Sequence, residues 1–416
     1  MTENEGEDAL LEAIARKEDE LVSLLQELIR SKPVNPPGDE ERAARILRPR
    51  LEKLDFDVTE YTEMETRPNL VARRSFGDGP TLLMNAHLDV VPAYDPDAWP
   101  CDPYSGEVID GRVYGRGACD HKSPIVAMLG AVEALLEEDV DLAGELLFVF
   151  DSNEERGGEH GMKYVVENAD LDPDMGIYAV TTSLDEEAAA YFDHAGIDNV
   201  FHANYGNQVF RVTVTGDVKH PLTPAETDSA GARSARLLPI IYDYTQEVKS
   251  RETPLVGNPD AEITTLESDG RPGRASQEAR LHVHRYYGPE EDTDEVYEEF
   301  RDLVIDGATE AGFGDAVSVE RIKHMPNTVV PTDHPLIEAT RAAARRVRSR
   351  EPTVTGIPAQ TGITWLVREL EMPMIMFGFG HVNLHHADPE WIAIDDVVDT
   401  TKAYALTYQQ LLRPST

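Results

Sequence analysis

Strand-length apolar runs alternate with helix-length amphipathic segments along much of this sequence. Apolar runs at residues 81–86, 145–150 and 175–180 predict strands, and the segments 123–136 and 159–168 between them predict helices. Alternation of this kind produces βαβ units, in which helices connect parallel strands. The sequence therefore predicts an α/β fold in which flanking helices cover a mixed, mostly parallel sheet. Further elements are predicted nearer the two ends: helices at 9–31, 40–54, 334–347 and 397–412, and a strand at 373–377.

The pattern changes between residues 208 and 322. The order there is strand, helix, strand, strand, helix, strand, which is the plan of a ferredoxin-like domain. A chain of 416 residues also exceeds what one hydrophobic core usually spans. We therefore expect an inserted ferredoxin-like α+β domain at 204–324 and a larger domain formed by 1–203 and 325–416. The inserted elements are predicted at 210–215, 229–248, 262–266, 278–287, 294–311 and 316–322.

The formal net charge is -40 at pH 7, and the acidic residues are spread along the chain. Nucleic acids and anionic membranes attract clustered Lys and Arg, so this charge argues against both as partners. Such acidity is typical of proteins from organisms with molar salt in the cytoplasm, where a Debye length of about 3 Å screens self-repulsion. We expect a halophilic protein, and the alternative is an ordinary acidic one.

The sequence indicates a soluble, cytoplasmic protein. Residues 2–8 lack the basic and apolar regions of a secretory signal, and no apolar run reaches membrane-spanning length. Cys101 and Cys119 are the only cysteines, too few for a disulfide framework in a chain of this length. We expect both to be reduced thiols.

Side chains typical of metal sites stand at the ends of several predicted strands. Ligands of open parallel sheets bind at the carboxyl ends of the strands, so these side chains are expected to share one cleft. They are His87 and Asp89 after 81–86, Asp120 just before the helix 123–136, Glu154 and Glu155 after 145–150, and His386 after 373–377.

Several carboxylates in one cleft would repel one another strongly without cations. Two imidazoles with several carboxylates suit two divalent ions, zinc first, with cobalt or manganese possible. Asp120 could bridge ions about 3.5–4 Å apart. His87 could ligate while Asp89 accepts its other ring N–H. One of Glu154 and Glu155 can ligate while the other acts as general base.

Each feature also has a simpler interpretation. A His-x-Asp pair on a strand is often only a hydrogen-bonded pair, and adjacent glutamates are often a solvated helix start. Gly115-Arg116-Gly117 could begin a dinucleotide loop, but Asp120 stands where that fingerprint has its third glycine. The metal interpretation depends on the whole set. The other histidines considered are interpreted as surface or structural residues: His121, His160, His282, His284 and His334.

Four motifs resemble, in order, those of the dinuclear zinc aminoacylase and carboxypeptidase family, which includes acetylornithine deacetylase, succinyl-diaminopimelate desuccinylase and glutamate carboxypeptidase. Together they are highly specific and extend over most of the chain. The resemblance implies that the inserted domain is a lid and dimerisation surface, and hence that the protein is a homodimer. The motifs are NAHLDVVP at 85–92, DPYSGEVIDGRVYGRGACDHK at 102–122, NEERGGEHG at 153–161 and LHHADPEWI at 384–392.

The resemblance also implies roles for single residues. Glu154 is the general base, Asp89 orients His87, and His220 steadies the tetrahedral oxyanion in the partner subunit's active site. Arg285 and Gly380 are implied as substrate-binding residues. The implied metal ligands are His87 and His386, one for each metal, Asp120 as the bridge, and Glu155.

The sequence departs from the family pattern at three places. After the strand that ends at residue 180 the family has an acidic ligand, and Asp185 is the best substitute in this sequence. Residues 360–362 read Gln-Thr-Gly where the family has Gly-Thr-Asp, and no asparagine stands near Arg274. These differences affect the expected substrate more than the expected metals.

We expect a metal-dependent amide hydrolase, either an N-acyl-amino-acid deacylase or a dipeptidase or carboxypeptidase. A metal-bridging water would attack the carbonyl of a small acyl-amino acid or peptide while Glu154 takes its proton. The alternative is a non-catalytic or repurposed small-molecule-binding homologue with an incomplete metal site. A nucleotide-dependent enzyme is not indicated, because the sequence has no phosphate-binding loop.

The net charge of -40 predicts that the fold depends on salt. In roughly molar KCl the protein should be folded and thermally stable, and it should lose both properties in dilute buffer as repulsion between carboxylates is unmasked. Circular dichroism melting curves at several KCl concentrations measure this. A melting temperature that is the same in dilute buffer and in molar salt would show that the protein is acidic but not halophilic.

Overall fold

The structure, a computed structural model, describes residues 3–191, 195–217, 228–359 and 362–414. It divides into two compact units. The larger unit comprises Met1–His202, Val330–Thr355 and Trp365–Thr416, and the smaller comprises Ala203–Val329 and Gly356–Thr364.

Two segments assigned by the sequence to the larger domain, 325–329 and 356–364, group with the smaller unit instead. Thr328 pairs with Asn204 in an antiparallel bridge, which ties the first segment to the start of the smaller unit. The backbone N–H of Gly356 donates to the carbonyl of Leu255 at 2.9 Å, which ties in the second. The hydrophobic pattern from which the boundaries were predicted does not indicate either of these backbone contacts.

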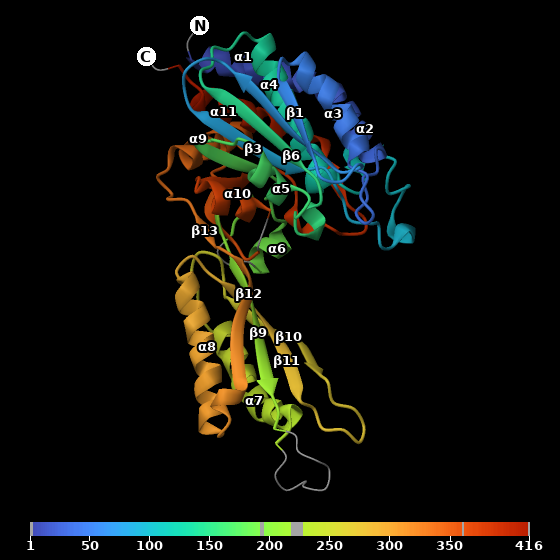
Figure 1. The fold of residues 1–416 in the computed structure, drawn as a ribbon. Coiled ribbons are helices and arrows are strands. Elements are labelled where there is room, and N and C mark those ends of the chain that lie inside the picture. Colours follow the sequence, from blue (N-terminus) through green and yellow to red (C-terminus); the bar gives the residue numbers. More distant parts are fainter. Residues whose placement is uncertain (1–2, 192–194, 218–227, 360–361, 415–416) are drawn as a thin grey trace. The chain divides into compact units, whose positions relative to one another are not determined.

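The main sheet is mixed, with the order β1-β2-β6-β3-β7-β15-β8-β13 and β14 beside β8 (Figure 1). The central strands β6, β3, β7 and β15 are parallel, whereas the pairs β1–β2, β2–β6 and β15–β8 are antiparallel. The predicted α/β fold is confirmed. The strands are β1 (Asp57–Thr62), β2 (Pro68–Ser75), β3 (Thr81–His87), β6 (Glu145–Asp151), β7 (Met175–Ala179), β8 (Asn199–Asn204), β13 (Thr328–Val329), β14 (Thr353–Ile357) and β15 (Met374–Phe377).

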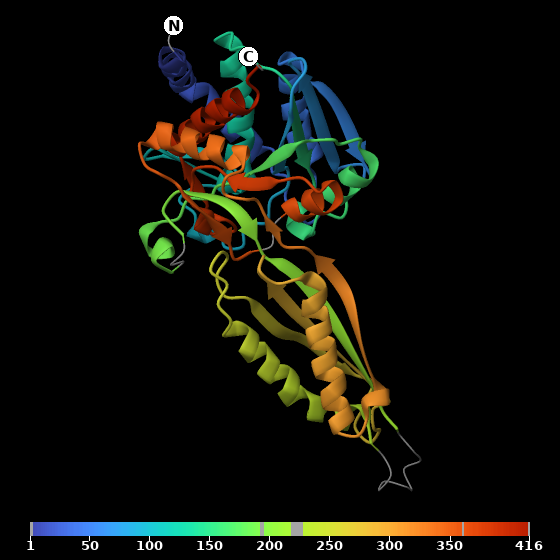
Figure 2. The same ribbon diagram turned by 90° about the vertical axis from the view of Figure 1, so that its left-hand side faces the viewer.

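The central strands are buried on both faces, as their continuous apolar sequences require. Every residue of β3 after Thr81 and every residue of β6 after Glu145 is buried. A layer of helices packs on one face, and the short helices α5 and α10 lie on the other side (Figure 2). The helices are α1 (Glu3–Arg16), α2 (Glu18–Arg30), α3 (Glu41–Lys53), α4 (Ser123–Glu137), α9 (Pro335–Arg348) and α11 (Ile394–Leu411) in the layer, with α5 (Met162–Asn168), α6 (Glu186–Tyr191) and α10 (Ile363–Leu370) elsewhere.

The helix predicted at 9–31 is two helices, α1 and α2, which meet at Lys17. Lys17 leaves the helical conformation, with φ -91° and ψ 7°, and its ammonium pairs with Glu137 at 2.7 Å and Glu133 at 3.6 Å on α4. Acidic residues occupy the first turn of α2, where they interact favourably with the positive end of the helix dipole. Apolar residues keep their helical spacing across Lys17, so the sequence pattern does not reveal the break between the two helices.

The smaller unit has the predicted β-α-β-β-α-β order. Its antiparallel sheet runs β10-β11-β9-β12, and both helices pack on one face through a core that includes Phe210, Leu281 and Phe300. Phe210 and Phe300 stack with ring centroids 4.6 Å apart. The elements are β9 (Gly206–Thr215), α7 (Ala230–Lys249), β10 (Asp260–Ser268), β11 (Glu278–Tyr287), α8 (Thr293–Glu310) and β12 (Val317–Met325).

A small three-stranded sheet lies beside the loops of the larger unit, with the order β16-β5-β4. It joins segments more than 270 residues apart in the sequence, because Trp391 of β16 pairs with Tyr114 of β5. Its strands are β4 (Glu107–Ile109), β5 (Arg112–Tyr114) and β16 (Trp391–Ala393). Among the described helices, none combines the length and apolar character needed to cross a membrane.

Candidate metal centre

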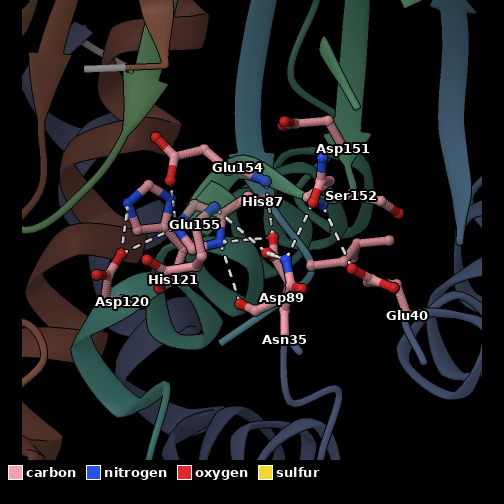
Figure 3. A network of polar contacts seen from close by, with 12 residues as sticks. Asn35, Glu40, His87, Asp89, Asp120, His121, Asp151, Ser152, Glu154 and Glu155 are labelled. Carbon is pink, nitrogen blue, oxygen red and sulfur yellow. Dashed lines mark hydrogen bonds and ion pairs between the residues drawn. The ribbon is translucent and has the colours of Figure 1, made fainter. Parts of the chain in front are cut away.

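The residues predicted after the strands of the main sheet come together at its carboxyl edge (Figure 3). His87 is the last residue of β3, and Glu154 and Glu155 begin the short turn Glu154–Arg156 after β6. Asp120 lies in the turn before α4, and His386 lies in the loop after β15. Parallel β3, β6 and β15 end on the same side, which explains why residues so distant in sequence meet.

The carboxylate of Asp120 lies at the middle of the group. Its Oδ1 is 3.0 Å from Nε2 of His87 and 3.0 Å from Nε2 of His121. Its Oδ2 is 3.3 Å from Nε2 of His386, which is in turn 2.9 Å from Oε2 of Glu155. The two oxygens of Asp120 therefore face two different sets of side chains.

We call His87, Asp120 and His121 the first cluster, and Asp120, Glu155 and His386 the second cluster. Within each cluster the possible ligand atoms lie within 4.8 Å of one another. The second cluster consists entirely of predicted ligands. His121 was interpreted from the sequence as a surface or structural residue, but its side chain is buried and faces Asp120.

His87 is held by the residue that follows its strand. Its Nδ1 lies 3.1 Å from the backbone carbonyl of Asp89 and 3.5 Å from the Asp89 carboxylate. The carbonyl is therefore the nearer acceptor for the ring N–H, and either contact leaves Nε2 free to face Asp120. The predicted orientation of His87 by Asp89 thus includes a main-chain contribution.

The Asp89 carboxylate has a second contact that the sequence did not reveal. It accepts hydrogen bonds from the backbone N–H groups of Glu154 at 3.1 Å and Glu155 at 3.3 Å, and from the side chain of Asn35 at 2.8 Å. Burial alone would raise the pKa of Asp89, but hydrogen bonds from His87 and Asn35 lower it below its usual value. Asp89 therefore stays ionised and fixes the turn that carries both glutamates.

Glu390 fixes the turn that carries Asp120. Its buried carboxylate accepts from the backbone N–H groups of Gly117 at 3.0 Å, Cys119 at 2.7 Å and Asp120 at 3.1 Å. It also pairs with Arg116 at 2.8 Å. Burial and the nearby Asp120 raise the pKa of Glu390 to about 7, against the opposing charge of Arg116. Glu390 of the motif at 384–392 therefore holds in place the turn at 115–122 that carries Asp120.

The centre brings several buried acidic groups close together. Burial raises the pKa of Glu154 to about 8, helped by the charges of Glu155 and Asp120 and opposed by His87. Hydrogen bonds to Asp120 and Glu155 raise the pKa of His386 to about 10. Oε1 of Glu155 is buried and has no hydrogen-bond partner among the described residues. A centre of carboxylates and imidazoles with an unpaired buried oxygen is the donor set that divalent cations bind.

Asp185 is not part of either cluster. Its carboxylate accepts from the backbone N–H of Ala188 at 2.7 Å, which caps the start of α6, and from the side chain of Asn383 at 3.0 Å. These contacts lower the pKa of Asp185. The sequence placed a metal ligand here because the family has one after this strand; the structure shows a helix cap instead.

Arg285 and Gly380, the two predicted substrate-binding residues, both pack closely against other residues of the protein. Arg285 is fully buried within the smaller unit, where its guanidinium pairs with Glu291 and lies 3.3 Å from the hydroxyl of Tyr244. Gly380 is buried, with φ at +121°, and an added Cβ would come within 2.7 Å of the Thr181 side chain. Both residues have packing roles in the structure, and their contact with substrate stays a prediction. His220 lies outside the described residues.

Two more residues near the clusters were missed. The hydroxyl of Tyr178 donates to Oε1 of Glu154 at 3.4 Å, and Nε2 of His385 lies 2.6 Å from Oγ1 of Thr181. Tyr178 stands in the middle of an apolar strand, where a tyrosine looks like a core residue. His385 precedes a predicted ligand and could have been considered on that ground.

The contacts of Asp89 predict a specific effect of Asp89→Asn. The substitution places an NH₂ group against donors that now meet a carboxylate oxygen, so the folded protein should lose about 1–3 kcal/mol of stability. Chemical unfolding in high salt measures it, with the exposed Asp97→Asn as the control. Equal unfolding midpoints for Asp89→Asn and the control would show that these hydrogen bonds do not support the turn.

Comparisons with known proteins identify the family. Residues 83–410 match Peptidase family M20/M25/M40. A succinyl-diaminopimelate desuccinylase from Gluconacetobacter diazotrophicus is 28% identical over 414 residues, 94% of this chain and 97% of that protein. An uncharacterized metallohydrolase from Methanococcus maripaludis is 33% identical over 165 residues, 36% of this chain and only 40% of the relative's length.

Solved structures share the fold. One of them, a Bacillus subtilis protein described as a dinuclear metal binding peptidase, has a TM-score of 0.67 at 15% identity and covers 96% of this chain and 99% of its own. The motif resemblance that the sequence suggested is thereby confirmed. The chain belongs to Peptidase family M20/M25/M40.

Proposed function

We propose that the protein is a metal-dependent amide hydrolase that acts on an N-acyl amino acid or a small peptide and binds two divalent cations. The observation that carries this proposal is the division of the Asp120 carboxylate between two clusters of ligand atoms. A carboxylate placed in this way is suited to bridge two ions. The desuccinylase relative over nearly the whole chain and the dinuclear peptidase of the same fold support this reading.

The proposed ligands divide into a shared residue and separate ones. Asp120 would bind both ions, His87 the ion of the first cluster, and Glu155 and His386 the ion of the second. Zinc is the proposed metal, since imidazole and carboxylate oxygen both suit it, and cobalt and manganese remain alternatives. Oε1 of Glu155, which has no partner in the described part of the chain, is available for the second ion.

Glu154 is the proposed general base. Its Oε2 lies 4.0 Å from Nε2 of His87, so it is beside the first cluster, and Tyr178 donates to its other oxygen. The pKa of about 8 shows how strongly this buried site favours a proton on Glu154. When bound, two cations would lower the pKa of water and polarise the substrate carbonyl. Glu154 would take the proton of the attacking water and deliver it to the leaving amine nitrogen.

Further parts of the proposal concern the setting of the protein. The smaller unit is proposed as lid and dimerisation surface of a homodimer, with His220 reaching the partner subunit's site. The protein is proposed to be cytoplasmic and halophilic, on the basis of two free cysteines, Cys101 and Cys119, and the charge of -40. Substrate contact by Arg285 stays a prediction, and its side chain is buried within the smaller unit.

A second candidate is a small-molecule-binding homologue with an incomplete metal site. The observation in its favour is that Asp185, the best sequence substitute for the acidic ligand, caps α6. Elemental analysis of protein dialysed in high salt separates the two. Two bound ions per chain with turnover of an acyl-amino acid or dipeptide support the hydrolase; one or none, without turnover, supports the binding protein.

Glu154→Gln should abolish most turnover without loss of metal. Removing a general base typically costs more than about a hundredfold in rate, and the amide keeps the size and hydrogen-bonding shape of the side chain. Steady-state hydrolysis of a panel of acetyl-, succinyl- and carbamoyl-amino acids and dipeptides, with metal analysis of each sample, tests this. The exposed Glu159→Gln, on the same loop, should behave as wild type. Turnover within a fewfold of wild type for Glu154→Gln would reject the assignment.

Stabilisation by zinc should increase between pH 6.5 and pH 8. Without metal the raised pKa values of His386 and Glu154 mean that the folded protein holds more protons than the unfolded chain over this range, so its stability falls as pH rises. Cations must displace the proton on His386, so their binding strengthens as pH rises. Calorimetry with zinc and with chelator, at one KCl concentration, gives the difference in melting temperature at each pH. A difference that shrinks as pH rises would contradict the proposed ligands.

A further inference from the structure

We propose that His121 is a metal ligand of the first cluster, so that this site has two imidazoles, from His87 and His121, and the bridging carboxylate of Asp120. The inference rests on the proposed function, since it concerns one of the two cation sites. It makes the two sites chemically different, because the second cluster has one imidazole and two carboxylates.

The positions of the two rings carry the inference. Nε2 of His87 and Nε2 of His121 are each 3.0 Å from the same oxygen, Oδ1 of Asp120. The rings are 4.0 Å apart between centroids and are tilted by 35°. Both nitrogens therefore converge on one point beside one carboxylate oxygen, and both side chains are almost fully buried, at 1% exposure.

A purely structural role fits His121 poorly. The ring packs edge-on against Tyr178, with centroids 4.8 Å apart, and Nδ1 is buried without a hydrogen-bond partner among the described residues. An apolar ring would pack there as well and would leave no buried nitrogen unpaired, so neither feature explains an imidazole at this position. The contact that uses the imidazole is that of Nε2, 3.0 Å from the carboxylate of Asp120.

The first cluster also lacks the ligand that the family pattern places after β7. Thr181 and Thr182 stand there, and the hydroxyl of Thr182 donates to the carbonyl of Asn199 at 2.6 Å. Asp185 caps α6. Without His121 the ion would have only His87 and Asp120 among the residues that the structure describes, whereas catalytic zinc sites usually have three protein ligands and one open position. His121 brings the number to three.

His385 is a weaker candidate for the same position. Its Nδ1 is 3.9 Å from Oδ2 of Asp120, and its Nε2 is engaged with Thr181 at 2.6 Å. It belongs to neither cluster. We therefore assign the additional ligand to His121 alone and leave His385 as a side chain positioned by Thr181.

The donor sets predict different metal preferences for the two sites. Imidazole ligands suit zinc, copper, nickel and iron, whereas carboxylate oxygens suit manganese and magnesium. The first cluster should therefore retain zinc when the second exchanges it for manganese. An acidic ligand in place of His121 would make the two sites more alike.

Zinc X-ray absorption on the wild-type protein provides the test that does not depend on a variant. Loaded with zinc at both sites, the chain should show three imidazoles shared between two ions; without His121 as a ligand it should show two. After exchange against excess manganese, the retained zinc should have two imidazole ligands. A spectrum with only one imidazole per zinc in both samples overturns the inference.

His121→Gln tests the same point through stoichiometry. It should reduce tightly bound zinc from about two ions per chain to about one after dialysis, because one protein ligand of three is removed. The matched control is His202→Gln, since His202 is also buried in the larger unit with an unpaired Nε2, and its Nδ1 contacts the carbonyl of Val330 instead of the centre. The His202→Gln protein should retain two zinc ions per chain.

His121→Asp provides a second variant in case glutamine prevents folding. It should bind two ions again, with manganese retained at the first site more readily than in wild type. Two tightly bound ions and wild-type absorption in His121→Gln overturn the inference while the proposed function stands. Absence of bound metal in the wild-type protein removes the proposed function as well, so the two failures are distinguishable.

Discussion

The organisation of the centre depends on the interaction between the buried carboxylate of Asp120 and the imidazoles around it. Burial disfavours its ionised form, yet four surrounding imidazoles, those of His385, His121, His386 and His87, keep its pKa well below the usual value. The backbone of the same residue is fixed by Glu390. Charge on the side chain and hydrogen bonding on the main chain thus act together to hold one carboxylate between two sets of ligand atoms.

A second set of buried polar groups positions the glutamates. Asn153, with φ at 61°, turns the chain sharply after β6, a conformation that asparagine tolerates better than most residues. Its backbone N–H lies 3.3 Å from Glu40, whose carboxylate pairs with the buried Arg67. Asn35 joins this group to Asp89. Glu154, the proposed general base, therefore lies on a turn that this network of buried hydrogen bonds and one ion pair holds in place.

Much of the fold could be predicted from the sequence because it follows from local periodicity. The six elements of the smaller unit lie within a few residues of their predicted bounds, and so do β3, β6 and α4. The antiparallel strands β1, β2 and β8 were not predicted, because their polar and charged residues interrupt the alternation on which a strand prediction relies. The break at Lys17 depends on ion pairs with another helix, which no local pattern contains.

The site was predictable as far as residue type and strand position decide it. His87, Asp120, Glu155 and His386 are metal-type side chains at strand ends, and they meet. His121 and Asp185 show the limit of this reasoning. Both depend on the direction in which a side chain leaves an irregular turn, and the backbone at 120–121 departs from helical angles where a regular helix start was expected. Spacing along the chain carries no information on such directions.

Replacing a carboxylate by an imidazole at the first cluster also changes the charge of the whole centre. With both cations bound, the carboxylates of Asp89, Asp120, Glu155 and an ionised Glu154 would balance the four positive charges. A further acidic ligand would leave one negative charge in excess. A centre without that excess better stabilises the negative charge that develops on a carbonyl oxygen during attack, and it lowers the pKa of nearby water more strongly. The loss of the acidic residue after β7 is therefore compatible with hydrolysis, provided that a neutral donor such as His121 maintains the coordination.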